Sequence, residues 1–463
     1  MLSLKQITLI TVSVTLFMDV MDGNVLNTAV PTMANHFQVN PVDLKVALIS
    51  YLLSIAIFTP TSGWIADCYG AKRIYIGGLA LFVVSSFYCG FATNVAEIVI
   101  GRFIQGIGSA FMIALGRLML ARVFPRSEMI EAMNKVVIVI SLAVMLGPFI
   151  GGIIVQHWSW PWIFWINVPI GTILIFVSIY CLKETAERER HPFDLIGFVL
   201  FGGGLALLCF SLSEMSDSRV QLPLALSNLG IALLLLFSYF FYARKKDFPI
   251  IQVLLFRIRT FRISVLSNIF ARLGFGGIPF LLPLMMQVAF GFSPQLSGMM
   301  LIPIALGIIF VKPWVSRVLQ KFGYRRYLLV STVIMSIMLC SFSLIDAHTP
   351  LWTIALFTFL FGGFVSAQYT GMNSLAFADI GNEKLSASTS ITTTTQIIGQ
   401  SLGVAAGALL LRFFSSLDTQ HFLLTQAVFH QTFLALAGAT LLSGIIFLSL
   451  RSDDGVAMLR REI

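Results

Sequence analysis

The stretch FMDVMDGNVLNTAVP, residues 17–31, places two aspartates, Asp19 and Asp22, inside a run that is otherwise apolar enough to cross a membrane. A carboxylate at the bilayer centre costs on the order of 2.5–3.5 kcal/mol on insertion scales. Side chains three residues apart lie on nearly the same face of a helix, so repulsion adds to the cost of burying both charges. The pair favours a group that binds and releases a proton near neutral pH. A structural salt bridge or a polar helix contact is the alternative interpretation.

The composition predicts a membrane protein. Of the 463 residues, 57% are hydrophobic and only 11% are charged, against about 25% charged residues in an average soluble domain. Apolar runs recur along the chain, each about 20 residues long and able to cross a hydrocarbon core of roughly 30 Å. Only helices satisfy the backbone in so many continuous apolar spans. We therefore expect an all-α polytopic protein whose first helix is retained rather than cleaved as a signal peptide.

The apolar runs predict fourteen transmembrane helices, at 7–31, 45–65, 74–93, 96–118, 132–155, 161–182, 194–213, 224–243, 263–289, 294–315, 327–346, 350–371, 386–411 and 429–450. With the N-terminus inside, most of the 30 lysines and arginines fall in cytoplasmic segments. The positive-inside rule then places both termini in the cytoplasm. The same placement accounts for the net charge of +9 without a nucleic-acid partner.

Several features recur about 253 residues further along the chain. Asn40-Pro41 precedes one predicted helix and Ser293-Pro294 another, and GAKR (70–73) matches GYRR (323–326). At an offset of 252, Gly147 and Gly151 fall on Gly399 and Gly403. This pattern is typical of transporters with two parallel halves and a substrate site between them near the midplane.

Five short motifs follow one another along the N-terminal half. They are MDGNVLNTAVP with Asp22, Asn27 and Pro31; GWIADCYGAKR with Gly63, Asp67, Gly70, Lys72 and Arg73; RFIQGIGSA with Arg102, Gln105, Gly106 and Gly108; AVMLGPFIGG with Gly147, Pro148, Gly151 and Gly152; and WPWIFWINVPIG. In this order they resemble the major facilitator superfamily, in its fourteen-helix drug:proton antiporter branch, and the likeness covers nearly the whole chain.

The resemblance implies two six-helix bundles, residues 1–190 and 263–463, separated by two linking helices and a basic loop in 191–262. It implies a proton-coupled secondary transporter in the bacterial inner membrane that exports hydrophobic or amphiphilic small molecules by alternating access. The expected partners are the substrate, protons and the lipid bilayer, with no metal, cofactor or nucleic acid. A monomer is expected, with an adaptor of an efflux system as a further partner to be tested.

The resemblance also assigns roles to two of the motifs. Asp67 and Lys72 are expected to hold the cytoplasmic side closed, around a tight turn at Gly70, although charge that only sets topology explains Lys72 and Arg73 nearly as well. The motif AVMLGPFIGG lies in the fifth predicted helix, 132–155, and is called the helix-five motif below. It is expected to allow close helix packing and, in this family, to block leak. The chain departs from the family pattern at Cys68, Ala71, Ala143 and Asn24, and Asp19 is an additional acid.

Two arginines in predicted spans are candidate partners of the aspartates. Counting about 1.5 Å per residue, Arg102 lies at the depth of Asp22, where it would stabilise the deprotonated carboxyl and release it on protonation. Arg272 lies near the midplane and falls on Asp19 at the offset of 253. We expect it to pair with Asp19 in one conformation or to meet an anionic group of the substrate. For both arginines, a purely internal counter-ion or packing role is the alternative.

The expected substrate cavity also takes polar and aromatic residues from other spans, namely Asn27, Phe361, Thr392 and Gln396. Hydroxyl side chains from 386 to 395 could line a wet path or bond back to helix carbonyls. Phenylalanine and methionine are abundant, which suits apolar ligands, but most of them must face lipid. A dedicated exporter of one endogenous metabolite such as a siderophore is the alternative transporter. An integral-membrane enzyme or a sensor is disfavoured, because no second acidic cluster, histidine pair for a metal or receptor domain is present.

Overall fold

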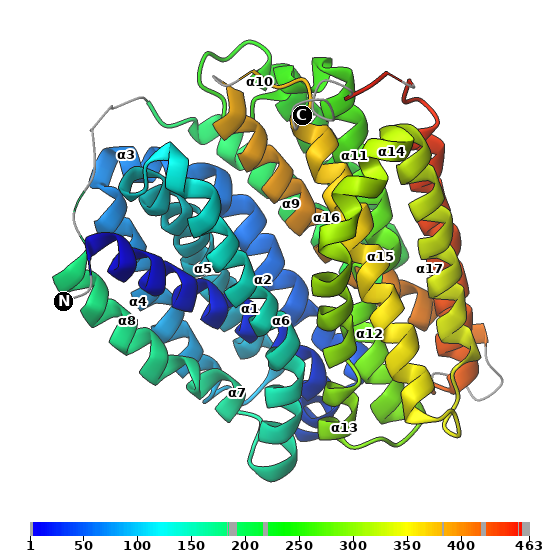
Figure 1. Ribbon diagram of the computed structural model, residues 1–463. Coiled ribbons are helices and arrows are strands. Elements are labelled where there is room, and N and C mark those ends of the chain that lie inside the picture. Colours follow the sequence, from blue (N-terminus) through cyan, green and yellow to red (C-terminus); the bar gives the residue numbers. More distant parts are fainter. Residues whose placement is uncertain are drawn as a thin grey trace. The chain divides into compact units, whose positions relative to one another are not determined.

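The computed structural model describes residues 3–182, 184, 192–215, 221–381, 384–417, 423–451 and 453–455, and every regular element in them is a helix (Figure 1). The α-helices are α1 (Leu4–Phe37), α2 (Lys45–Phe58), α3 (Ser62–Tyr69), α4 (Ala71–Cys89), α5 (Val95–Val123), α6 (Arg126–His157), α7 (Trp162–Trp165), α8 (Asn167–Cys181), α9 (Leu195–Met215), α10 (Leu222–Ala243), α11 (Arg259–Phe275), α12 (Ile278–Leu284), α13 (Pro294–Met299), α14 (Ile302–Ser341), α15 (Leu351–Phe377), α16 (Leu385–Leu417) and α17 (Gln426–Phe447). Short 3-10 turns occupy η1 (Pro41–Leu44), η2 (Thr59–Thr61), η3 (Val253–Arg257) and η5 (Phe342–Leu344), and η4 (Met285–Ala289) is a π-helical turn.

Twelve helical stretches of the described residues are long and apolar enough to cross a membrane. This confirms the predicted all-α polytopic class. One of the twelve, Pro294–Leu344, has 51 residues, more than two crossings of a roughly 30 Å core require. The 19-residue helix α4 is not among the twelve. The predicted count of fourteen stays a prediction.

The chain forms two compact units. Unit 1 comprises Met1–Leu195 and Ser293–Met299, and unit 2 comprises Ile196–Phe292 and Met300–Ile463. In unit 1, α1 packs on α5, α6 and α8, α4 packs on α5 and α8, and α13 packs on α6. In unit 2, α11 packs on α15, α16 and α17, and α14 packs on α15 and α17. The predicted bundles at 1–190 and 263–463, with linking helices in 191–262, stay a prediction.

Two predicted loops prove to be single-residue breaks between helices. Only Gly70 separates α3 from α4, and α14 runs through residues 316–326 with a non-helical backbone at Gly323 alone. Both glycines have positive φ, 98° and 71°, where a Cβ would be strained. The predicted break within 316–326 is confirmed at Gly323, but it is shorter than predicted, because Lys and Arg are good helix formers and the helix continues through them. The tight turn predicted at Gly70 is confirmed.

The predicted helix 263–289 is also interrupted, since α11 ends at Phe275 and α12 begins at Ile278. A Cβ on Gly277 would lie 2.6 Å from the carbonyl oxygen of Gly403 in α16. A Cβ on Gly276 would lie 3.2 Å from Cα of Gln400 in the same helix. The two glycines therefore let the backbone bend against α16, which hydropathy alone does not reveal.

Candidate functional site

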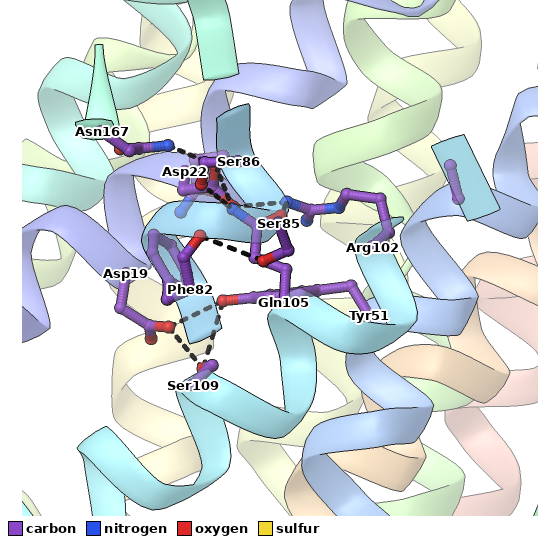
Figure 2. Close-up of polar contacts among 12 residues, drawn as sticks. Asp19, Asp22, Tyr51, Phe82, Ser85, Ser86, Arg102, Gln105, Ser109 and Asn167 are labelled. Atoms are coloured by element: carbon purple, nitrogen blue, oxygen red, sulfur yellow. Dashed lines mark hydrogen bonds and ion pairs between the residues drawn. The ribbon is translucent and has the colours of Figure 1, made fainter. Parts of the chain in front are cut away.

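Asp22 lies at the centre of a buried polar network in unit 1 (Figure 2). Its Oδ2 accepts a hydrogen bond from Nη1 of Arg102, in an ion pair whose side chains are 1% and 0% exposed. Its Oδ1 accepts from Nδ2 of Asn167 at 2.7 Å and from Nε2 of Gln105 at 3.1 Å. The predicted contact between Asp22 and Arg102 is confirmed. Three donors from α5 and α8 therefore surround this carboxyl.

Arg102 is held mainly by Asp22 and by neutral groups. Its Nη1 also donates to Oε1 of Gln105 at 2.7 Å, one helical turn further along α5. The guanidinium carbon lies 3.9 Å from the ring centroid of Tyr51, within the range of a cation–π contact. Its Nε and Nη2 atoms are buried without a hydrogen-bond partner among the described residues. The ion pair is therefore the main compensation for burying this charge.

Asp19 has different partners, although it lies on the same helix. Its Oδ1 accepts hydrogen bonds from the hydroxyls of Tyr51, at 2.7 Å, and Ser109. Figure 2 shows both hydroxyls pointing at this one oxygen. No described residue donates a hydrogen bond to Oδ2 of Asp19, and none forms an ion pair with it. Asp19 is a 4% exposed carboxyl that only neutral groups hold.

The helix-five motif lies on α6 and contacts two other helices. A Cβ on Gly147 would lie 2.9 Å from Cβ of Asn24, and one on Gly151 would lie 2.7 Å from the carbonyl oxygen of Val25, both in α1. A Cβ on Gly152 would instead lie 2.8 Å from Cα of Gln295 in α13. The predicted close packing is confirmed. The motif thus brings α6 against the helix that carries both aspartates.

Pro148 of the same motif faces α13. A Cβ on Gly298 of α13 would lie 2.9 Å from the carbonyl carbon of Pro148. The backbone N–H of Gln295 donates to Oε1 of Gln156 in α6 at 3.2 Å, which adds a polar contact. The short helix α13 therefore docks on α6 through backbone approaches that only small residues allow. A role in blocking leak stays a prediction.

The motif GWIADCYGAKR (63–73) contacts the end of α8. Nζ of Lys72 donates to the carbonyl oxygen of Ile179, in the last turn of α8, at 2.7 Å. Its backbone N–H donates to Glu184 at 3.3 Å. A cation at a helix C-terminus is favourable for the exposed carbonyls there. Gly63 and Asp67 lie in α3, and Arg73 is exposed at the start of α4. A role for this motif in conformational change stays a prediction.

The residues predicted for a substrate cavity are only partly brought together. In unit 2, Nε of Arg272 donates to Oδ1 of Asn268 at 2.8 Å, and its guanidinium carbon lies 4.2 Å from the ring centroid of Tyr369. Gln396 accepts from the hydroxyl of Tyr369 at 3.0 Å and donates to Asn373 at 2.7 Å. Arg272 and Gln396 therefore meet at the same tyrosine. The predicted pairing of Arg272 with Asp19 stays a prediction.

The other three predicted cavity residues, Phe361, Thr392 and Asn27, are all buried. Phe361 is 3% exposed and packs against Phe342, with ring centroids 5.3 Å apart, in the packed interior of unit 2. Thr392 is buried on α16, and its hydroxyl has no partner among the described residues. Asn27 is buried on α1, five residues after Asp22. Of the predicted hydroxyl run on α16, Ser388, Thr389 and Thr395 bond back to helix carbonyls.

Sequence reasoning missed four members of the network, namely Tyr51, Ser86, Ser109 and Asn167. Ser86 accepts from Nε2 of Gln105 at 2.7 Å, so it holds a side chain that itself holds Asp22. All four are polar residues inside predicted spans, which was the available signal. The motif context supplied Gln105 but assigned it no role. Among the described residues, no group of His, Cys, Asp and Glu side chains could hold a metal ion.

Comparisons with known proteins agree with this architecture. The sequence profile of the Major Facilitator Superfamily matches residues 12–257 and 264–460. "Putative multidrug resistance protein MdtD" of Pectobacterium atrosepticum is 33% identical over 436 residues, which cover 93% of this chain and 92% of that protein. The protein of the same name in Escherichia coli O6:H1 is 32% identical, over 96% of this chain and 95% of that protein.

Two solved structures share the fold at low identity. A D-xylose-proton symporter has a TM-score of 0.71 at 13% identity, over 98% of this chain and 99% of that chain. The peptide-family transporter PepTSo has a TM-score of 0.72 at 14% identity, over 98% and 99% of the two chains. The predicted superfamily is confirmed, and the chain is a multi-pass secondary transporter rather than an enzyme. It belongs to the Major Facilitator Superfamily.

Proposed function

We propose that this protein exports hydrophobic or amphiphilic small molecules in exchange for protons, by alternating access across the bacterial inner membrane. Both termini lie in the cytoplasm in this proposal, as the distribution of Lys and Arg favours. The names of the MdtD relatives support drug-like substrates. The monomer is the transporting unit, and an efflux-system adaptor is a partner to be tested.

The observation that carries the proposal is the unequal charge of the buried network in unit 1. The network contains two carboxyls, Asp19 and Asp22, but a single guanidinium, that of Arg102, which pairs with Asp22. If both acids were ionised, one buried negative charge would be uncompensated, which is costly in an apolar interior. Binding one proton removes that cost. The network is therefore suited to exchange at least one proton.

Asp19 and Asp22 have different contacts, and the proposal assigns them different roles. Asp22 accepts hydrogen bonds from Arg102, Gln105 and Asn167, and a proton on Asp22 would compete with these donors. Asp19 is held by hydroxyls alone and has one oxygen with no donor. Protonation of Asp19 therefore sacrifices fewer favourable contacts than protonation of Asp22. Asp19 takes the first proton in this scheme. Protonation of Asp22 then weakens its ion pair and frees α1 from α5 and α8.

Transport in proteoliposomes under an imposed pH gradient tests the proposal. Suitable probes are ethidium, a lipophilic cation, and the anion 1-pyrenebutyrate. We expect Asp19→Asn to lower the number of protons exchanged per probe, and the double variant Asp19→Asn/Asp22→Asn to abolish uphill transport while downhill movement continues. Glu97→Gln, at the first turn of α5 and outside the network, is the control. Uphill transport by the double variant would contradict the proposal.

A dedicated exporter of one acidic metabolite is a second candidate function. Arg272 favours it, because this buried cation has no acidic partner among the described residues. The two candidates differ in what a deletion strain loses. Multidrug export predicts increased sensitivity to several unrelated compounds, whereas the dedicated exporter predicts loss of one secreted compound with unchanged drug sensitivity.

A further inference from the structure

Arg272 is a buried cation whose charge is not balanced inside unit 2. The side chain is 5% exposed, and its Nη2 atom is buried without a hydrogen-bond partner among the described residues. Its Nε reaches only a neutral oxygen, Oδ1 of Asn268. A guanidinium carries five donors in a rigid fork that matches a carboxylate or a phosphate. The guanidinium of Arg272 is buried, and only some of its donors have a hydrogen-bond acceptor.

No acidic side chain is available on the surrounding helices. The helices α11 to α17, as the structure bounds them, contain no Asp or Glu. The Asp residues that follow α14 and α15, Asp346 and Asp379, are bonded to Thr349 and Thr260 respectively. The missing counter-charge is therefore a property of the sequence of these helices, and rotation of a side chain within them cannot supply it.

Other favourable contacts only partly replace a counter-ion. Arg272 lies in the last turn of α11, where the helix dipole favours a cation, and it stacks on Tyr369. Neither contact supplies a hydrogen-bond acceptor for Nη2 of Arg272. The site is also shaped for the arginine, because a Cβ on Gly399 would lie 2.9 Å from Cδ of Arg272. Room is reserved on α16 for this one side chain.

We infer that Arg272 binds an anionic group of the transported molecule, a carboxylate or a phosphate, with Tyr369 and Gln396 as neighbouring polar groups. Tyr369 holds the guanidinium plane from one side, and Gln396 fixes the hydroxyl of Tyr369. An amphiphilic substrate would place its acidic group here and its apolar body on the surrounding aliphatic and aromatic side chains. This inference rests on the proposed transport function and names its substrate class as anionic amphiphiles.

Binding of matched probes to the purified protein tests the inference without any pH gradient. The probes are 1-pyrenebutyrate and its primary amide, which share one apolar body and differ in charge. We expect the wild-type protein to bind the carboxylate more tightly than the amide. In Arg272→Gln the Kd for the carboxylate should rise by roughly 10- to 100-fold, about 1.4–2.8 kcal/mol, while the Kd for the amide stays constant. Arg272→Lys should keep part of the preference, because it keeps the charge but loses the fork.

Lys312→Gln is the matched control, since it removes an exposed cation from α14 of the same unit. It should leave both affinities unchanged. Equal wild-type affinity for the two probes, or a carboxylate preference that survives in Arg272→Gln, would overturn the inference. Constant binding of the amide shows that a variant is folded. If Arg272→Gln also fails to bind the amide, the test uses the Arg272→Lys variant instead. Full retention of the carboxylate preference in Arg272→Lys would count against recognition by the planar guanidinium.

The anion could also come from a lipid headgroup, so the measurement is repeated in nanodiscs with and without phosphatidylglycerol. A carboxylate affinity that does not depend on this lipid supports a substrate site, and displacement of the probe by the lipid assigns Arg272 to lipid binding and overturns the inference. The result is separable from the transport mechanism. Uphill transport by the double aspartate variant, together with a carboxylate preference that Arg272→Gln loses, would count against the transport mechanism alone. The opposite pair of results would count against the anion site alone.

Discussion

The two units use similar glycine contacts between helices but bury opposite excess charges. In unit 1, Gly147 and Gly151 of α6 approach α1, which carries Asp19 and Asp22. In unit 2, Gly403 and Gly399 of α16 approach α11, which carries Arg272. The network of unit 1 has two carboxyls for one arginine, whereas α11 to α17 have one buried arginine, Arg272, and no carboxyl. The two units therefore share a way of packing helices through glycines and differ in the sign of the buried charge beside these contacts.

The largest difference should appear when the two buried arginines are removed. Arg102→Gln leaves Asp22 buried and unpaired, which should destabilise the protein by about 3–5 kcal/mol. Arg272→Gln removes a charge that has no counter-ion, so its cost should be near zero or negative. Thermal unfolding of the two variants in the same detergent compares them directly. An equal loss of stability would show that the charge of Arg272 is balanced after all.

A smaller loss of stability should follow when the close glycine contacts are filled, and it should be similar in both units. Gly151→Ala would push against Val25, and Gly403→Ala against Gly276, which directly follows α11 and whose Cα would be 3.0 Å from the new Cβ. Each substitution should cost about 1–3 kcal/mol by overpacking. Gly77→Ala and Gly438→Ala are matched controls, since nothing lies within 4 Å of their Cβ positions, and they should stabilise their helices by about 0.5–1 kcal/mol. If only one of the two substitutions, Gly151→Ala or Gly403→Ala, lowered the stability, the glycine contacts of the two units would not be equivalent.

The sequence predicted the parts of the site that depend on composition and on spacing along one chain segment. Asp19 and Asp22 are detectable because acids are rare in spans, and Arg102 could be placed opposite Asp22 because helix rise fixes depth. Tyr51, Ser109 and Asn167 were missed because the rotation of α2, α5 and α8 about their own axes depends on packing. A polar residue in a span can face a network or bond back to its own helix, and hydropathy does not distinguish these cases.

The fold shows the same division between what hydropathy encodes and what packing decides. Long apolar runs fixed the helices, whereas the breaks at Gly276 and Gly323 depend on local backbone approach and on a positive φ. Phe361 illustrates the limit for substrate residues. Its position in an aromatic-rich span favoured a cavity, but the structure packs it on Phe342 in the interior.

The smallest predicted difference concerns the equivalent loop cations, Lys72 in unit 1 and Arg325 in unit 2, which are related by the offset of 253. Nζ of Lys72 binds the carbonyl oxygen of Ile179 at the end of α8, and Arg325 is exposed two residues after Gly323. Lys72→Ala should therefore cost about 0.3–1 kcal/mol through the lost contact with the helix terminus, and Arg325→Ala should cost almost nothing. Because salt screens such exposed charges, the difference in unfolding temperature should shrink in high salt. A difference that persists in high salt would mean that Lys72 stabilises the turn by packing rather than by charge.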